Sequence, residues 1–380
     1  MSIRIGLFFA AYFVLLGIQL PYFPVWLAEL RSLSPEAIGW VVGAGAWSRV
    51  LVVLIGRAAD RTGERKRPIL LLALLTALGI ATLTFAGDFG PLLLLSALIG
   101  LGYAGMLPLA DALALDEGRR LRLDYGRMRL WGSLAFIAAA LGTGALIDRT
   151  GPWIVLPGLL LAALGIFTAG LGLPDTRTGG GGEGGRVRDL VRQPGFVRVA
   201  VAAGLIQASH AVYYGFGTLH WQAAGLSGGR IGWLWAEGVI AEVILFAFSG
   251  AVVARVGAVR LLWLAGALAS LRWLGTALTT APEALALLQW LHGASFGATH
   301  LATMYFLRDA LPRHLLASGQ ALYAAGLAVM MGGAIPLAGF AYAAFGGGAF
   351  LFAAAVAALG GLAALSISGP TAGRPAPRDS

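Results

Sequence analysis

The chain repeats itself at an almost constant separation. The motif Leu-Ser-x-x-x-Ile-Gly-Trp occurs at residues 33–40 and again at 226–233, which is 193 residues further along. A second motif, Gly-x-x-x-(Asp/Ala)-Arg-x-Gly, occurs at 56–63 and at 250–257, a separation of 194 residues. Repeats at one period indicate a fold built from homologous units. In an apolar chain they predict two membrane halves in the same orientation, the build of many secondary transporters.

The composition supports a membrane protein. Of the 380 residues, 58% are hydrophobic and only 12% are charged, more apolar side chains than a water-soluble core can hide. The net charge of +9 does not indicate nucleic-acid binding, because nearly all the basic residues fall in short gaps between apolar stretches. The chain has no cysteine, which excludes disulfides, thiolate metal sites and a cysteine nucleophile.

Twelve apolar stretches are long enough to cross a bilayer as helices. The first is too long for a signal-peptide core and is expected to be retained. The gaps on the side of the N-terminus hold twenty-two basic residues against three on the other side (Arg31, Arg149 and Arg230), which predicts that both termini are cytoplasmic, in a bacterial inner membrane. The expected spans are about 4–28, 36–56, 68–86, 91–115, 128–148, 152–173, 197–221, 230–254, 260–279, 283–305, 316–343 and 347–367.

The longest polar gap divides the chain. It contains a run of glycines at 179–185 and is expected to act as a flexible linker, with a regulatory role as the alternative. The predicted organisation is therefore a six-helix half at 1–173, a cytoplasmic linker at 174–195, a second six-helix half at 196–368 and a disordered tail at 369–380.

Several polar side chains fall near the middle of the expected spans. A charge there costs several kcal/mol unless it is paired or faces water, so each is a functional candidate. Arg49 and Glu242 are separated by the repeat period of 193, so opposite charges occupy matching positions in the two halves and are expected to face a shared central space. The other candidates near mid-depth are His210, Arg272 and His292.

Two stretches also carry polar and aromatic residues on one helical face. The seventh carries Gln207, His210, Tyr214 and Trp221, and the tenth carries Gln289, His292, Phe296 and His300. These stripes predict a lined cavity. The alternative is that the histidines only hydrogen-bond neighbouring helices. Metal binding is not expected, because the eight residues between His292 and His300 span more than two turns.

The gap after the second stretch contains Gly56, Asp60, Arg61 and Gly63. A glycine-bounded turn with one acid among bases can lock helix ends together and release them, and we expect a gating role. The spacing resembles the signature of the major facilitator superfamily. That resemblance implies an all-α membrane protein of twelve transmembrane helices, with two six-helix halves related by pseudo-twofold symmetry.

A second resemblance involves residues 108–111, 123–133, 271–275 and 291–292. These segments look like the proton-coupled lactose permease family, and the resemblance implies substrate binding by Asp111 and Arg129 and proton coupling by Arg272 and His292, with Glu242 in the position of a helix 8 acid. The sequence departs from that family at Ser295, where the permease has a glutamate, and at Phe136, where it has a sugar-stacking tryptophan. An aromatic wall of the substrate site is expected from Phe136, Tyr213, Tyr214, Trp221 and Phe296.

The phenylpropionate permease family is a closer likeness, through residues 124–133, 210–216, 221–225, 241–243 and 300–302 as well. This resemblance implies proton-coupled uptake of an aromatic carboxylate by alternating access, without a cofactor and without any need for a second subunit. We expect Arg129, Arg49 or both to bind the carboxylate, and Glu242 to carry the proton, with His292 as a relay. The alternative is a proton-coupled sugar or nucleoside symporter. A drug antiporter and a membrane enzyme are less favoured, since the sequence lacks a Gly-Pro-x-x-Gly bend at 134–147 and any HExxH or GxSxG motif. A receptor without flux stays open, because only a transport measurement separates it from a transporter.

Overall fold

The apolar stretches fold as helices, because a helix satisfies every backbone polar group within its own segment and bilayer lipid offers no other partner. The computed structural model describes residues 1–175 and 187–367, and its regular elements in these ranges are all helical. The first half comprises α1 (Ser2–Arg31), α2 (Pro35–Trp47), η1 (Ser48–Leu51), α3 (Val52–Thr62), α4 (Lys66–Leu83), α5 (Phe89–Leu121), α6 (Tyr125–Thr150), η2 (Pro152–Ile154) and α7 (Val155–Leu171).

A short helix, α8 (Val187–Val191), precedes the second group. It lies within the expected linker 174–195, half of which, at 176–186, is outside the described residues, as is the expected tail 369–380. The second group comprises α9 (Phe196–Ala208), η3 (Tyr213–Gly217), α10 (Thr218–Ala223), α11 (Gly228–Ala247), α12 (Ser249–Val256), α13 (Ala258–Leu278), α14 (Pro282–His292), η4 (Gly293–Gly297), α15 (Ala298–Ala310), α16 (Arg313–Phe345), η5 (Gly346–Gly348) and α17 (Ala349–Leu365).

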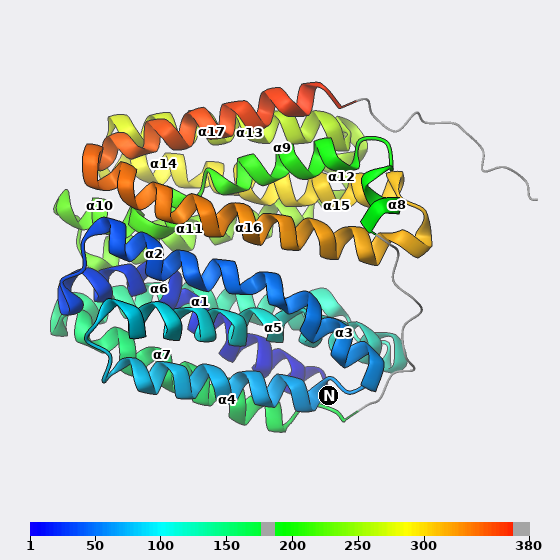
Figure 1. The fold of residues 1–380 in the computed structure, drawn as a ribbon, viewed down its shortest axis with the longest axis horizontal. Coiled ribbons are helices and arrows are strands. Elements are labelled where there is room, and N and C mark those ends of the chain that lie inside the picture. The colour runs from blue at the N-terminus through cyan, green and yellow to red at the C-terminus, as the bar shows by residue number, and fades with distance from the viewer. Residues whose placement is uncertain (176–186, 368–380) are drawn as a thin grey trace, which may run out of the picture.

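Some expected spans consist of more than one element. Length and hydropathy identify nine helices able to span a membrane within the described ranges, or ten when a bent pair is counted, with Pro35–Thr62, Phe196–Ala223 and Arg313–Leu365 each taken as one. The last of these contains α16 and α17, which are joined at one end of the molecule and run in opposite directions (Figure 1). When these two are separated and α14, η4 and α15 are joined, the described residues form twelve helical rods, six before α8 and six after it.

The eighth expected span, 230–254, is not straight. The structure divides it into α11 and α12, which meet at an angle of 70°. The break falls at Phe248, directly before Ser249 and Gly250, and Ser and Gly neighbours are a common cause of sharp helix kinks.

The two groups of helices lie in two layers (Figure 1). All rods run roughly parallel, so the molecule has a Ser2 end, where α1 begins, and an Arg31 end, where it finishes. The layers contact each other mainly through α2 with α16 and α6 with α11. Near the Arg31 end the backbones are so close that a Cβ on Gly39 would lie 3.0 Å from the Ile335 carbonyl oxygen. These close contacts hold helices of one layer against helices of the other, beside the polar residues at the centre of the molecule.

Candidate functional site

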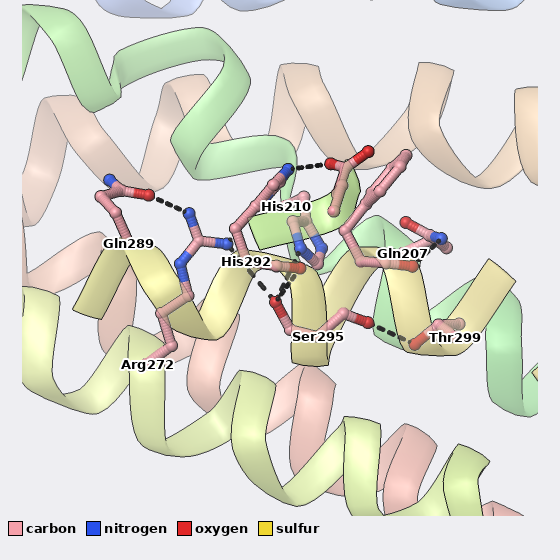
Figure 2. A network of polar contacts seen from close by, with 9 residues as sticks. Gln207, His210, Arg272, Gln289, His292, Ser295 and Thr299 are labelled. Atoms are coloured by element: carbon pink, nitrogen blue, oxygen red, sulfur yellow. Dashed lines mark hydrogen bonds and ion pairs between the residues drawn. The ribbon is translucent and has the colours of Figure 1, made fainter. Parts of the chain in front are cut away.

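A chain of polar side chains crosses the second layer of helices (Figure 2). Arg272 on α13 donates from one terminal nitrogen to Nδ1 of His292, at 2.8 Å, and from the other to Oε1 of Gln289, at 2.6 Å. Nε2 of His292 lies 2.7 Å from Oε1 of Glu242 on α11. Arg272 is 1% exposed and His292 is 6% exposed, so this chain is inside the protein.

The partners of His292 define its tautomer. A guanidinium can only donate hydrogen bonds, so Nδ1 of His292 must accept from Arg272. The ring proton of a neutral imidazole is then on Nε2, which donates it to the Glu242 carboxylate. His292 therefore links a cation to an anion through two directed hydrogen bonds, so a change of charge at Glu242 alters the hydrogen bonding of Arg272.

Two π-helical segments shape this cluster. The segment η3 carries Tyr213 and Tyr214, and η4 carries Ser295 and Phe296. A π segment inserts one residue into an α-helix and is often found at functional sites. The His292 ring stacks on the Phe296 ring with centroids 5.3 Å apart, while Arg272 lies over the ring of Tyr213 at 4.8 Å. The guanidinium is thus held by aromatic faces as well as by hydrogen bonds.

His210 connects this cluster to the seventh rod. Its Nδ1 is 3.1 Å from the Ile206 carbonyl oxygen, which assigns the proton to Nδ1, and its Nε2 is 3.5 Å from the Ser295 hydroxyl. The ring, fully buried, is in edge or stacked contact with the rings of Tyr214 and Phe296. His210 therefore has an interhelical role and also forms part of an aromatic group.

The first layer holds a second cluster, centred on Arg49 in η1. One terminal nitrogen of Arg49 donates to the Tyr103 hydroxyl at 2.7 Å, and its Nε is buried without a hydrogen-bond partner. No carboxylate of the described residues lies within ion-pair distance of Arg49. The positive charge of Arg49 is therefore stabilised by the neutral hydroxyl and the ring face of Tyr103, and not by an anion.

Arg129 is in a different situation. Its Nε is 3.7 Å from Oδ1 of Asp111, which also accepts a hydrogen bond from the Tyr125 hydroxyl at 2.9 Å. The Arg129 guanidinium lies over the ring of Phe13 at 4.1 Å. The side chains of Arg129 and Asp111 remain 28% and 30% exposed, so the pair borders open space although it belongs to the helical bundle.

The two clusters interact across the layers. Arg49 and Tyr214 of the second layer lie close enough for the ionisation of one to affect the other, and so do Arg129 and Glu242. Arg49 and Glu242, the two charges related by the repeat, belong to opposite layers, and a central space shared by the two stays a prediction. They form no ion pair with each other in the part of the chain that the structure describes.

Four other expected site residues have contacts of their own. Phe136 is 5% exposed, and its backbone carbonyl abuts Gly17 on α1, so it belongs to helix packing. Trp221 is fully buried against Tyr213, and its indole nitrogen has no hydrogen-bond partner. Gln207 donates to the Phe296 carbonyl oxygen at 3.3 Å. His300 is exposed and interacts electrostatically with Glu242.

The glycine-bounded turn forms as expected, but its ion pair comes from another residue. Gly63 ends α3 with φ of 68°, a left-handed conformation that favours glycine, whereas a Cβ on Gly56 would meet nothing within 4 Å. Asp60 and Arg61 are exposed. Arg65 instead forms an ion pair with Asp116 on α5, which ties this turn to the end of a neighbouring helix of the same layer.

Three tyrosines of the first cluster were not among the predicted site residues. The Tyr103 hydroxyl oxygen accepts a hydrogen bond from Arg49, and the Tyr125 hydroxyl donates one to Asp111. Tyr12 is buried near Arg49, Tyr103 and Asp111. Tyrosines occur throughout membrane helices, so their type gave no signal. A sequence clue existed for Tyr125, which lies inside the segment 123–133. In the described ranges no three His, Asp or Glu side chains lie close enough to hold a metal ion.

Comparisons with known proteins identify the fold and family. The chain is 35% identical over 369 residues to the probable 3-phenylpropionic acid transporter of Escherichia coli (strain K12), covering 93% of this chain and 94% of that protein. It is 26% identical over 305 residues to the lactose permease of Citrobacter freundii, covering 73% and 72%. Both resemblances drawn from the motifs are therefore confirmed.

A solved structure supports the same fold. The crystal structure of a mutant of the nucleoside transporter NupG aligns with a TM-score of 0.83 and 15% identity, over 96% of this chain and 99% of that one. At this identity the likeness concerns the fold alone, and it confirms the predicted architecture.

The sequence profile described as the MFS_1 like family matches residues 1–354. The protein is a multi-pass membrane transporter that binds a small-molecule substrate, and it is not an enzyme. The chain belongs to the MFS_1 like family, a branch of the major facilitator superfamily of secondary transporters.

Proposed function

We propose that this transporter imports a small aromatic carboxylate together with protons, by alternating access between its two six-helix halves, 1–173 and 196–368. The observation that carries the proposal is the Arg49 guanidinium, which has no carboxylate partner in the described ranges. A guanidinium binds a carboxylate through two parallel hydrogen bonds. Arg49 is therefore the preferred anchor, ahead of Arg129, which is already paired with Asp111.

The charges of the two clusters favour an anion. Arg129 balances Asp111, and Arg272 balances Glu242 through His292. Arg49 then leaves one positive charge near the centre of the bundle. A bound carboxylate would neutralise it, whereas a cation would add to it, and an uncompensated charge at this depth is unfavourable.

An aromatic substrate is supported by the rings beside this charge. Tyr214 lies near Arg49, the His210 ring stacks on the Tyr214 ring, and the Phe296 ring contacts His210 in turn. Stacked or edge contacts between rings stabilise binding by about 0.5–1.5 kcal/mol beyond their buried area. The relative named for 3-phenylpropionic acid agrees with this substrate class.

Proton coupling is assigned to Glu242. Its side chain is 18% exposed and is the carboxylate that His292 contacts. Ser295 occupies the place where lactose permeases have a glutamate, so the coupling carboxylate here comes from α11. Protonation of Glu242 removes the anion opposite Arg272, and the His292 hydrogen bonds transmit this change.

The protein in liposomes under an acid-outside gradient tests the proposal. We expect saturable uptake of radiolabelled 3-phenylpropionate above that of protein-free liposomes, where the neutral acid leaks in. Uptake of a labelled sugar but not the acid would favour the alternative symporter. The absence of protein-dependent flux for either substrate, with the protein shown to be folded, would contradict both.

The sugar or nucleoside alternative has its own observation. The carboxylate of Asp111 is 30% exposed beside Arg129, and a carboxylate can accept hydrogen bonds from substrate hydroxyls. Competition by unlabelled sugars against unlabelled aromatic acids separates the two.

We also propose that both termini lie in the cytoplasm of a bacterial inner membrane, because basic residues concentrate at the Ser2 end. We propose that a monomer is sufficient for transport, because one chain supplies both clusters.

A further inference from the structure

A groove of about 600 Å³ lies on the first layer at the Ser2 end, between the start of α1 and the turn that joins α5 to α6. Its lining does not include Arg49, and it belongs to neither polar cluster. Its position where helices begin and end places it at the boundary between the bilayer and water. Its lining includes Ser2, Arg122, Arg127, Leu130, Trp131 and Leu134.

The polar edge of the groove carries two uncommitted positive charges. Arg122 and Arg127 are both exposed, and neither pairs with a carboxylate among the residues that the structure describes. The acid of the lining, Asp124, accepts a hydrogen bond from the backbone nitrogen of Arg127 at 3.2 Å and so caps α6. The carboxylate is thus engaged with a helix end, which leaves the two guanidinium groups available to an anion.

Arg122 adopts a conformation that is unusual for its residue type. It ends α5 with φ of 53° and ψ of 41°, in the left-handed region where helices usually have glycine. The backbone cost of an arginine there is of order 1 kcal/mol or more. A glycine would relieve this strain, and the arginine instead places a guanidinium beside the groove.

The other edge of the groove is apolar. Leu130, Trp131 and Leu134 of α6 are 44%, 59% and 51% exposed. Trp131 also rests against α1, since a Cβ on Gly6 would lie 3.0 Å from its ring. Tryptophan is enriched at the level of lipid headgroups, and leucines lie deeper, along acyl chains. The lining therefore passes from charge to hydrocarbon along α6.

We propose that this groove binds an anionic phospholipid, with the phosphate between Arg122 and Arg127 and one acyl chain along Leu130, Trp131 and Leu134. Guanidinium groups match phosphate geometry, and clusters of basic residues beside a membrane span attract anionic lipids. Phosphatidylglycerol offers the negative charge without the added ammonium of phosphatidylcholine. A free anion would contact only the two arginines, whereas a phospholipid would also cover the apolar edge. The mixed lining therefore favours a lipid.

Thermal unfolding in detergent, followed by tryptophan fluorescence, tests this site. We expect dioleoylphosphatidylglycerol to raise Tm saturably, and dioleoylphosphatidylcholine and glycerol 3-phosphate to have little effect. The Arg122→Gln/Arg127→Gln protein should need at least tenfold more phosphatidylglycerol for the same shift, because two charge-assisted contacts are lost. The matched control is Arg260→Gln, an exposed arginine in the first turn of α13, outside the groove.

A second variant separates loss of binding from loss of folding. Arg122→Gly removes the guanidinium but suits the left-handed backbone, so the protein should be at least as stable without lipid while the phosphatidylglycerol shift weakens. The proposal is overturned by an unchanged shift in both groove variants, by an equal shift with phosphatidylcholine, or by glycerol 3-phosphate alone reproducing the shift. An equal loss in Arg260→Gln would indicate diffuse attraction and would overturn it too.

Discussion

Arg49 and Arg129 belong to the same layer but differ in what already neutralises their charge. Arg129 has Asp111 within 3.7 Å, whereas Arg49 donates to the Tyr103 hydroxyl and has a buried, unpartnered Nε. A substrate carboxylate gains more from the arginine whose donors are free. A charge-assisted hydrogen bond contributes about 1.5–3 kcal/mol, which corresponds to roughly 10- to 100-fold in affinity.

Arg49→Gln should therefore raise the half-saturating concentration of the aromatic acid at least tenfold. Arg49→Lys should recover only part of the affinity, because lysine cannot bind in a bidentate manner. The measurement is the concentration dependence of uptake in liposomes with equal amounts of folded protein. Arg149→Gln, an exposed arginine near the Arg31 end, serves as the control. Unchanged affinity in Arg49→Gln would exclude Arg49 as the anchor.

Glu242 can be tested by separating accumulation from exchange. Glu242→Gln keeps an acceptor for the Nε2 proton of His292 but cannot take up a proton. Accumulation driven by a pH gradient should disappear, whereas exchange of internal for external substrate, which needs no net proton movement, should persist. The control is Glu237→Gln, a carboxylate on the same helix that accepts from Trp233 at 2.7 Å. Retained accumulation in Glu242→Gln would assign the proton elsewhere.

At the scale of helices, the π segment η4 depends on one glycine. A Cβ on Gly293 would lie 2.7 Å from the Ala241 carbonyl oxygen on α11, and backbone atoms cannot move aside as a flexible side chain can. Overpacking of this kind costs about 1–3 kcal/mol. Gly293→Ala should lower Tm by several degrees and reduce transport.

The matched control lies in a helix that leaves room. A Cβ on Gly142 of α6 would meet nothing within 4 Å, so Gly142→Ala should leave Tm unchanged or raise it slightly through better helix propensity. Tryptophan fluorescence during heating reads both variants. Equal behaviour of the two would show that the contact between η4 and α11 is not tight.

Sequence patterns could predict the helical rods but not their interruptions. Hydropathy identifies Pro35–Thr62 and Phe196–Ala223 as membrane spans because it is averaged over many residues. The π segments depend on packing between helices, which leaves no local period. The 70° bend has a local sequence mark, the neighbours Ser249 and Gly250, but that pair does not give the angle. In the same way Arg272, His292 and Glu242 were predicted because charge is rare in membranes, whereas Tyr12 and Tyr103 carry no charge and their role follows from contacts between helices.

For the whole molecule, the question is what holds the two layers together at the Arg31 end. Asp148 of α6 accepts from the backbone nitrogens of Gly228 and Gly229, at 2.6 and 2.8 Å, and so caps α11 of the other layer. Tyr22 donates to the Ala140 carbonyl oxygen at 2.8 Å in the same place. A Cβ on Gly232 would lie 2.5 Å from that oxygen, so the helices touch along their backbones. Alternating access requires this end to separate.

The Asp148 cap should therefore set part of the balance between closed and open. A carboxylate at a helix N-terminus contributes about 1 kcal/mol, and its loss should shift the balance toward opening by roughly fivefold. Because the chain has no cysteine, a single Ala140→Cys reports opening at a side chain that is fully buried when closed. Adding Asp148→Asn should raise its alkylation rate several-fold, whereas adding Arg149→Gln, one residue along, should not. An unchanged rate with Asp148→Asn would mean that the Asp148 cap does not set this balance, and that the Tyr22 hydrogen bond and the close glycine contacts are sufficient to hold this end closed.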